Sequence, residues 1–210
     1  MQRFILAVLV ASIGLAGSAQ AQRVRPARAP SARWVINGHS TAALGTSVGD
    51  AGGSINTSSG LGGGVEVGYL VTPRLLAYAG LDIAKQAIDV AGLGGDFGLT
   101  HLEAGARLSF PIARSRATPY LGAWVGRRSL STTVDNFITG ESSDLSLSGL
   151  AAGVTGGVQV FMSPKLALDG GLSVGIGKMG HVKVDGHRED WGTPDNTTTT
   201  RIRFGANWYP

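Results

Sequence analysis

Eight acidic and basic residues stand in segments of the chain where polar and apolar residues alternate. They are Glu66, Asp82, Glu103, Arg107, Arg128, Asp169, Arg201 and Arg203. Carboxylates and guanidinium groups form bidentate hydrogen-bonded pairs, which suit a confined space. Because charges removed from water must be paired or solvated, we expect these side chains to form an ion network if the fold gathers them. Its role would be structural, and the alternative is a polar pathway or a switchable gate.

Residues that could carry catalysis are few. His39 and Ser40 are adjacent, but neighbours in a strand point to opposite faces, so His39 would not activate Ser40. His101 and Glu103 share a face and could form an acid–base pair, yet the pattern places no nucleophile beside them. We therefore expect no catalytic residues and no enzymatic activity.

Metal and cofactor signals are equally weak. His181, His187, Glu189 and Asp190 cluster in the sequence without matching a compact ligand motif. The glycine run at 92–95 lacks the lysine and the helix of a phosphate-binding loop. The sequence therefore predicts neither a metal site nor a cofactor site.

The alternating segments predict strands, because a strand with two unlike faces repeats every second residue. We predict eight, at 33–44, 61–71, 75–88, 97–110, 119–130, 147–162, 166–180 and 198–209. Short turns carry Pro73, Pro111 and Pro164, while longer loops are predicted at 45–59, 91–96, 131–144 and 181–196. Helices are disfavoured because each interior glycine would cost a helix about 1 kcal/mol. Alternating short and long connections are typical of outer-membrane barrels, whose short turns are periplasmic.

The two faces of the predicted strands differ in an informative way. In the second strand Leu61, Val65 and Val67 share one face, whereas Glu66 lies with glycines on the other. The fourth, sixth and eighth strands divide similarly, and every charge in these four strands falls on the glycine-containing face. A water-soluble barrel would place its charges outside, so this pattern predicts an apolar, lipid-facing exterior and a polar lumen.

Aromatic residues near the predicted strand ends are expected to form interfacial girdles. These residues are Trp34, Tyr78, Tyr120, Trp124, Trp208 and Tyr209. Strand parity leaves an inward orientation open for Tyr78, Tyr120 and Trp124.

The N-terminus and the composition indicate an exported protein. Residues 1–21 have a charged start, an apolar run and small residues before Gln22, which predicts a cleaved signal peptide. Residues 22–32 form a basic lead and 33–210 the barrel domain. The chain has no cysteine, and its 33 glycines are spread through the alternating segments rather than gathered in a linker. Several excess arginines of the net charge of +4 lie before the barrel, so we expect no nucleic-acid partner.

Segments such as VEVGYLVTPRLLAYAGLDI and GVQVFMSPKLALDGGLSVGIG resemble hairpins of the small eight-stranded outer-membrane barrels, namely the membrane domain of outer-membrane protein A and the opacity-type proteins. The resemblance covers nearly all of the mature chain. It implies outer-membrane lipid, lipopolysaccharide and the barrel assembly machinery as partners. Members usually end in an aromatic residue, whereas this chain ends Trp208-Tyr209-Pro210. Some such barrels are lipid-modifying enzymes, a function that we consider the less favoured here.

The sequence therefore predicts an all-β, eight-stranded antiparallel up-and-down transmembrane β-barrel in a bacterial outer membrane, as a monomer. The expected function is structural or interactive, with a lumen filled by polar side chains and long external loops that can meet a partner. A narrow porin-like pore, or a passage for small apolar molecules, is the alternative. A soluble ligand-binding barrel is disfavoured by the position of the charges.

Overall fold

The computed structural model describes residues 33–50, 53–56, 59–90, 93–135, 142–184, 187–189 and 195–210. The expected signal peptide and basic lead lie outside these residues. Nearly all of the described chain is β-strand. No helix within those ranges is long and apolar enough to cross a bilayer.

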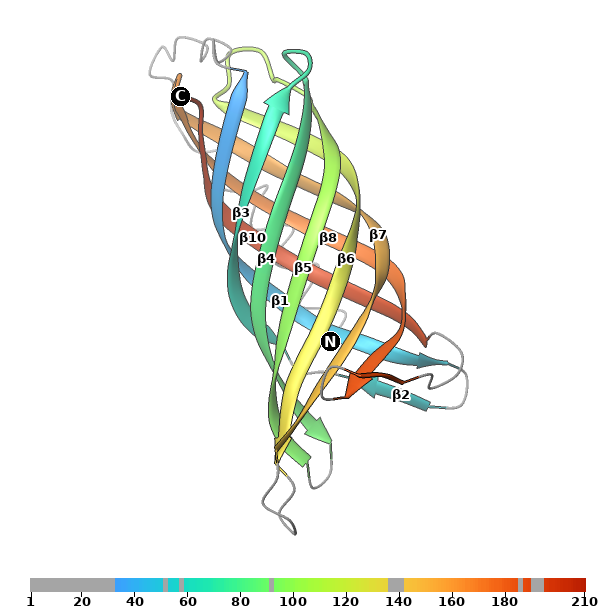
Figure 1. The fold of residues 1–210 in the computed structure, drawn as a ribbon. Helices are drawn as coiled ribbons and strands as arrows, with labels where there is room; N and C mark the ends of the chain where they lie inside the picture. The colour runs from blue at the N-terminus through green and yellow to red at the C-terminus, as the bar shows by residue number, and fades with distance from the viewer. Residues whose placement is uncertain are drawn as a thin grey trace.

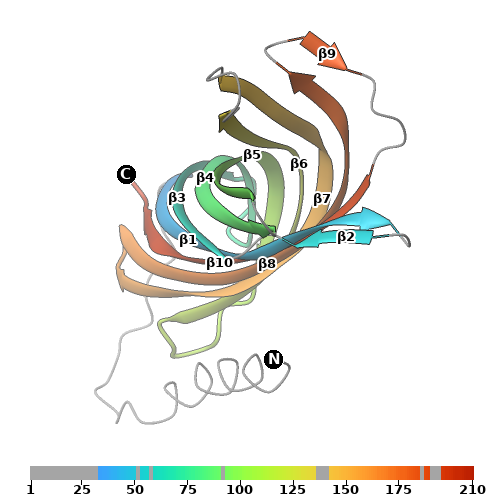
Figure 2. The ribbon, with the colours of Figure 1, turned by 90° about the horizontal axis from the view of Figure 1, so that it is seen from below.

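The described residues form a closed barrel of eight long strands (Figure 1). These are β1 (Trp34–Asp50), β3 (Gly60–Leu70), β4 (Leu75–Val90), β5 (Leu93–Ser109), β6 (Ala117–Asp135), β7 (Ser142–Ser163), β8 (Leu166–Val184) and β10 (Asp195–Trp208). Two short strands, β2 (Gly53–Asn56) and β9 (His187–Glu189), pair with β1 and β8 respectively. Successive barrel strands pair antiparallel, and β10 closes the ring by pairing with β1 (Figure 2). The predicted fold is confirmed.

The exterior of the barrel is apolar and its interior polar, as the alternation predicts. On β3 Leu61 is 77% exposed while Glu66 is only 3% exposed. The same division holds on β5, where Leu102 faces outward between the buried side chains of His101 and Glu103. Exposed large apolar residues of this kind occur on all eight barrel strands. This arrangement fits a barrel whose solvent is lipid.

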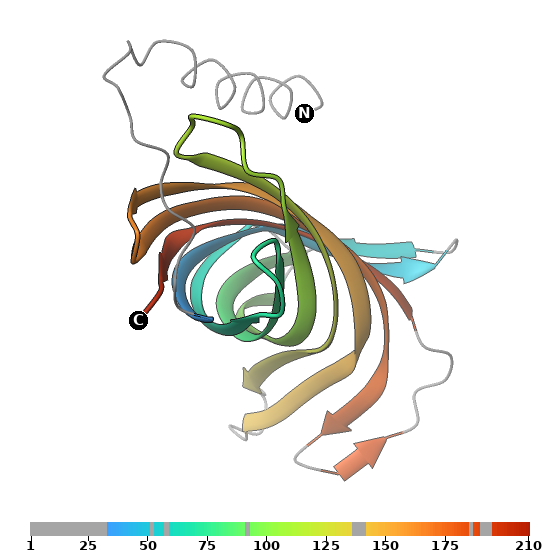
Figure 3. The same ribbon diagram turned by 90° about the horizontal axis from the view of Figure 1, so that it is seen from above.

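The two ends of the barrel differ. The segments 71–74, 110–116 and 164–165 join strands at one end, which we name the short-turn end, and they contain Pro73, Pro111 and Pro164. The C-terminus lies at this end as well (Figure 1). The opposite end, named here the long-hairpin end, carries β2 and β9, which extend away from the ring (Figures 2 and 3).

The predicted loops at the long-hairpin end are too long. β1 continues to Asp50, β6 to Asp135 and β8 to Val184, while β5 begins at Leu93, β7 at Ser142 and β10 at Asp195. Most of the residues expected in loops 45–59, 91–96, 131–144 and 181–196 are therefore strand. Backbone pairing needs no apolar face, so ladders persist after the hydrophobic alternation has ended.

Three layers fill the described part of the lumen. One apolar cluster, at the short-turn end, contains Val35, Leu76, Ala167 and Tyr209. A second, toward the long-hairpin end, contains Ala84, Leu99 and Leu130, with Leu147 packed against it. The predicted ionic residues lie between the two clusters along the strands.

The aromatic residues divide between the two faces. Trp34 and Trp208 face outward at the short-turn end, as expected of an interfacial girdle. Tyr78, Tyr120, Trp124 and Tyr209 are instead buried inside the barrel. The girdle prediction is therefore wrong for Tyr209, because Trp208 faces outward and its strand neighbour must face inward.

Candidate functional site

Six of the eight predicted ionic side chains form one continuous network across the lumen. Arg107 on β5 lies 2.5 Å from Glu66 on β3, which also faces Arg203 on β10 at 3.5 Å. Arg203 Nη2 lies 2.6 Å from Glu103 Oε1 and 3.1 Å from Asp82 Oδ2. Arg201 joins the same two acids at 2.8 Å for Asp82 and 2.7 Å for Glu103. Three arginines thus compensate three carboxylates.

Strand β1 supplies neutral and titratable partners that the sequence analysis did not include. His39 Nε2 lies 2.7 Å from Asp82 Oδ1, and the hydroxyl of Thr41 donates to that oxygen at 2.7 Å. His39 Nδ1 is 2.6 Å from Asn37 Oδ1. These residues follow one another at a spacing of two in the first predicted strand, so sorting its faces as in the other strands would have placed all three in the lumen.

Asp169 does not meet an arginine within ion-pair distance among the described residues. Its carboxylate accepts hydrogen bonds from the Tyr120 hydroxyl at 2.9 Å and from Asn207 Nδ2 at 3.0 Å. Asn37 Nδ2 donates to the side-chain oxygen Oδ1 of Asn207 at 2.8 Å, which fixes the orientation of the Asn207 amide. The expectation that Asp169 would oppose an arginine is wrong at the level of direct contact, because neutral donors from β6 and β10 hold it.

Arg128 also lies outside the six-residue network. Its guanidinium carbon is 5.5 Å from the centre of the Trp124 ring, whose indole nitrogen donates to Ser173 at 2.9 Å. Both terminal nitrogens of Arg128 are buried without a hydrogen-bond partner among the described residues. The structure therefore separates Arg128 from the carboxylates that the sequence analysis expected it to meet.

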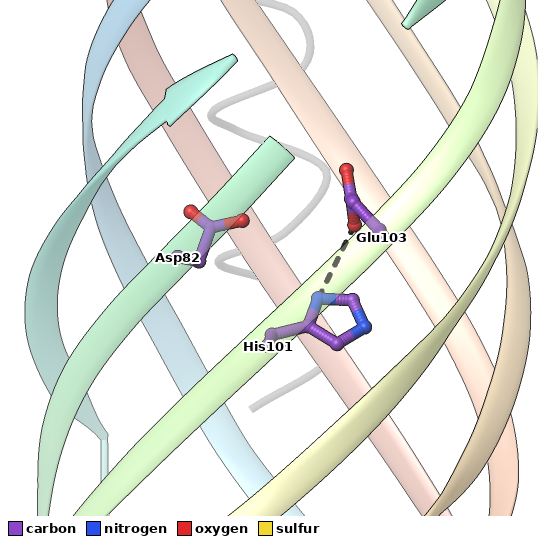
Figure 4. A group of neighbouring side chains, drawn as sticks. All are labelled: Asp82, His101 and Glu103. Carbon is purple, nitrogen blue, oxygen red and sulfur yellow. Dashed lines mark ion pairs between the residues drawn. The ribbon is translucent and has the colours of Figure 1, made fainter. Parts of the chain in front are cut away.

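Asp82, His101 and Glu103 are close enough for one ligand atom of each to lie within 4.8 Å of the others (Figure 4). The oxygens of these carboxylates are already engaged, however. The Asp82 carboxylate contacts His39, Thr41 and both arginines of β10. The Glu103 carboxylate contacts the same two arginines and lies 3.2 Å from His101 Nδ1. A cation here would have to displace guanidinium groups, so the arrangement is an ion network rather than a metal site.

The possible catalytic pairs lack the geometry for catalysis. His39 faces the lumen while Ser40 is exposed on the outer surface, so the two are on opposite faces as expected. His101 and Glu103 are paired, and the ring of His101 also contacts Trp124 edge-on with centroids 4.8 Å apart. No serine or threonine hydroxyl of the described residues is recorded in a hydrogen bond to either histidine.

Glycines on the lumen wall provide the space in which the large aromatic side chains lie. A Cβ at Gly157 or Gly171 would lie 2.5 Å from the Tyr120 hydroxyl, and one at Gly153 would lie 2.5 Å from the Trp124 ring. On β5 a Cβ at Gly105 would lie 2.9 Å from the Tyr78 hydroxyl. Interior positions of narrow barrels must be filled by side chains that fit together. The inner face of the barrel is therefore rich in glycine because large aromatic and ionic side chains occupy the lumen beside it.

Together these features define an eight-stranded transmembrane β-barrel with an apolar exterior and a packed, ionic lumen. No family model matches the chain, and no curated protein matches it.

Several solved structures are similar to this fold. Neisserial surface protein A has 20% sequence identity and a TM-score of 0.60, over 84% of this chain and 97% of that one. The outer membrane protein OprG from Pseudomonas aeruginosa has 13% identity and a TM-score of 0.57, over 84% and 95%. Ail, the attachment invasion locus protein of Yersinia pestis, was solved with the heparin analogue sucrose octasulfate and has 15% identity and a TM-score of 0.51, over 84% and 98%. At these identities the similarity establishes the fold, and the predicted resemblance to small outer-membrane barrels is confirmed at that level.

Proposed function

We propose that this protein is a closed structural and interaction barrel of the bacterial outer membrane, exported with a cleaved signal peptide. The short-turn end would be periplasmic and the long-hairpin end external, as in outer-membrane barrels generally. Pro73, Pro111 and Pro164 would then be periplasmic turn residues. The hairpins β1–β2, β6–β7 and β8–β9 would present the surface available to an external partner.

The outer surface supports a membrane location. Outward residues on β8 are apolar from Leu166 to Ile176, apart from Gly170, and the next outward residue is Lys178. At about 3.3 Å per residue and a tilt of about 40°, this segment spans roughly 25 Å, the height of the apolar band of an outer-membrane barrel. Trp34 and Trp208 stand at its boundary on the short-turn side.

Exposed charges support contact with lipid phosphates. Every exposed charged residue whose side chain the structure describes is basic. Arg33, Arg74, Arg114, Arg116 and Lys165 lie at the short-turn end, and Lys85, Arg127 and Lys178 lie toward the other. Basic groups at both borders of an apolar belt match the anionic head groups of membrane lipids. Outer-membrane lipid and lipopolysaccharide are therefore the partners that we propose for this surface, with the barrel assembly machinery for insertion.

The observation that carries the closed state is the filling of the lumen. The six-residue ion network crosses it, and all of its side chains are at most 7% exposed. One apolar cluster lies toward each end of the described lumen, with the ion network between them. A narrow pore would need these layers to part, and a passage for apolar molecules would need an apolar lumen.

The interaction role is supported by the nature of two of the similar proteins. One is named as a surface protein, and another as an attachment invasion locus protein solved with a heparin analogue. We propose that the long hairpins of this chain likewise present a contact surface, and no catalytic activity forms part of the proposal.

Two experiments test the proposal. Electrophoresis in SDS, with and without boiling, of protein from an outer-membrane fraction should show a mobility shift of a detergent-resistant barrel. Recovery in the soluble periplasmic fraction without a shift would refute the membrane location. Conductance across a planar bilayer should then stay at the level of the bare membrane. Sustained single-channel steps that scale with salt concentration would replace the closed barrel by the pore.

A further inference from the structure

Arg128 is the one arginine of the lumen that has no carboxylate partner among the described side chains. It is 2% exposed and lies on β6, one strand away from His101 on β5. The nearby Arg201 is also close to the Trp124 ring, at 5.1 Å, but Arg201 is paired with Asp82 and Glu103. Because the six-residue network is internally neutral, it leaves no carboxylate for Arg128.

Asp169, the remaining acid among the described side chains of the lumen, is too far away to pair with Arg128. Asp169 and Gly175 both lie on β8, and the six-residue separation between them corresponds to roughly 20 Å along a strand. A Cβ at Gly175 would lie 2.6 Å from Nη2 of Arg128, so the guanidinium group reaches the Gly175 end of that interval. Asp169 is held at the other end by Tyr120 and Asn207.

Two further donors lie on β10, the strand that pairs with β8 at Gly175. Thr199 on β10 is directly opposite Gly175 on β8, and Thr197 is opposite Gly177 one step further toward the long hairpins. Both threonine side chains are buried, and neither hydroxyl has a hydrogen-bond partner among the described residues. A guanidinium group and two hydroxyls thus gather where the described lumen has no carboxylate to receive them.

We propose that this region of the lumen binds one small inorganic anion of the halide class, with Arg128 as its charged donor and Thr199 and Thr197 as hydroxyl donors. A buried cation without a partner is strongly unfavourable, and a bound anion would compensate it. The anion must be small because Trp124 and Arg128 already fill the space over Gly153 and Gly175. The proposal does not depend on whether the barrel conducts.

The surroundings also define how the ion would enter. Leu99, Leu130 and Ala84 cover the walls formed by β4, β5 and β6, whereas Thr197 and Thr199 line the wall formed by β10. An anion entering from the long-hairpin end would therefore follow the threonine side of the lumen. Thr197 is the outer of the two hydroxyls on this path.

Trp124 provides a local probe, because bromide and iodide quench indole fluorescence on contact. Replacing Trp34, Trp191 and Trp208 by phenylalanine leaves Trp124 as the single tryptophan of the four in the chain. In detergent micelles, with gluconate holding the ionic strength constant, bromide should quench this variant along a saturating curve. Chloride, which competes for the site without quenching the indole, should shift the curve to higher bromide concentrations.

Arg128→Gln in the same background should abolish the saturating component and leave weak, linear quenching. The matched control is Arg127→Gln, which changes the neighbouring outward-facing arginine of the same strand and should retain saturation. Thr199→Val should weaken binding while keeping Arg128 in place. Linear quenching that is identical in the parent and in Arg128→Gln would overturn the proposal.

A second measurement covers the case in which Arg128→Gln fails to give a heat-modifiable barrel. The folding equilibrium constant of the unmodified chain should rise about tenfold when chloride exceeds its dissociation constant tenfold, relative to gluconate at equal ionic strength. Thr199→Val should require more chloride for the same rise. Equal stability in chloride and gluconate would overturn the proposal independently of any variant at Arg128.

Discussion

At the scale of single residues, the lumen uses two different means of satisfying the hydrogen-bonding needs of buried carboxylates. Glu66, Asp82 and Glu103 are compensated by arginines, whereas Asp169 receives only neutral donors. Hydrogen bonds to a charged group contribute more than those between neutral groups, about 1.5–3 kcal/mol. Both arrangements therefore depend on the donors that surround each carboxylate.

Arg203 is the arginine whose loss should affect the network most, because it contacts all three acids. We predict that Arg203→Ala lowers the free energy of unfolding by about 3–5 kcal/mol, the cost of leaving buried charges without their partner. Urea unfolding in lipid vesicles would measure this change. Arg74→Ala, an exposed residue in a turn, should stay within about 0.5 kcal/mol of the parent. Equal stability of both variants would refute a structural role for the network.

A variant at Tyr120 should measure how much a neutral hydrogen-bond donor to Asp169 stabilises the barrel. Tyr120→Phe removes the hydroxyl that donates to Asp169 and leaves the ring in place, so we predict a loss of about 1.5–3 kcal/mol in unfolding free energy. Tyr69→Phe is the matched control, because the Tyr69 hydroxyl only accepts a hydrogen bond from the exposed Arg33. A loss as large in Tyr69→Phe would mean that the measurement does not report on the Asp169 contact.

At the scale of the strands, adjacent glycines on β8 have opposite roles. A Cβ at Gly171 would lie 2.5 Å from the buried Tyr120 hydroxyl, whereas one at Gly170 would have only Phe204, at 3.8 Å, within contact range. We predict that Gly171→Ala destabilises the barrel by about 1–3 kcal/mol through overpacking, and that Gly170→Ala is nearly neutral. Unfolding in vesicles, as above, would compare them.

The same position allows a test of complementarity between strands. In the Tyr120→Phe background the hydroxyl is absent, and the nearest remaining contacts of a Cβ at Gly171 would be 3.3 Å and 3.6 Å. Gly171→Ala should then cost less than it does in the parent, a non-additivity of the kind that double-mutant cycles detect for residues in contact. Strictly additive losses would show that Tyr120 does not set the requirement for glycine.

Strand faces and turn positions could be predicted from the sequence because both follow from local pattern. Glu66 among the glycines of β3, and Pro73 and Pro164 at strand ends, are such cases. The lengths of β6 and β7 could not be predicted, since Ser131 to Asp135 and Ser142 to Asp144 lack the apolar alternation although their backbones pair. Which acid meets which arginine also could not, because contacts such as Arg201 to Asp82 join residues far apart in sequence and depend on the shear of the closed barrel.

At the scale of the whole molecule, the distribution of polarity is the reverse of that in a water-soluble barrel. The acids whose side chains the structure describes are buried in the lumen. The exposed charges that it describes are basic and lie toward the two borders of the apolar belt. The free energy of folding therefore depends on lipid covering that surface. The cost of placing a charge on that surface should therefore depend on its depth in the bilayer. A soluble protein would show no such dependence.

Two positions on one face of β8 allow that dependence to be measured. Leu172 lies midway between Leu166 and Lys178, whereas Ile176 is the last apolar outward residue before Lys178, and both side chains are exposed. In vesicles, Leu172→Arg should cost about 2–4 kcal/mol of unfolding free energy, as for a charge at the bilayer midplane, and Ile176→Arg about 0–1 kcal/mol. Equal effects, or a gain in stability from Leu172→Arg, would indicate that water rather than hydrocarbon surrounds this surface. The conclusion that the barrel spans a membrane would then be wrong.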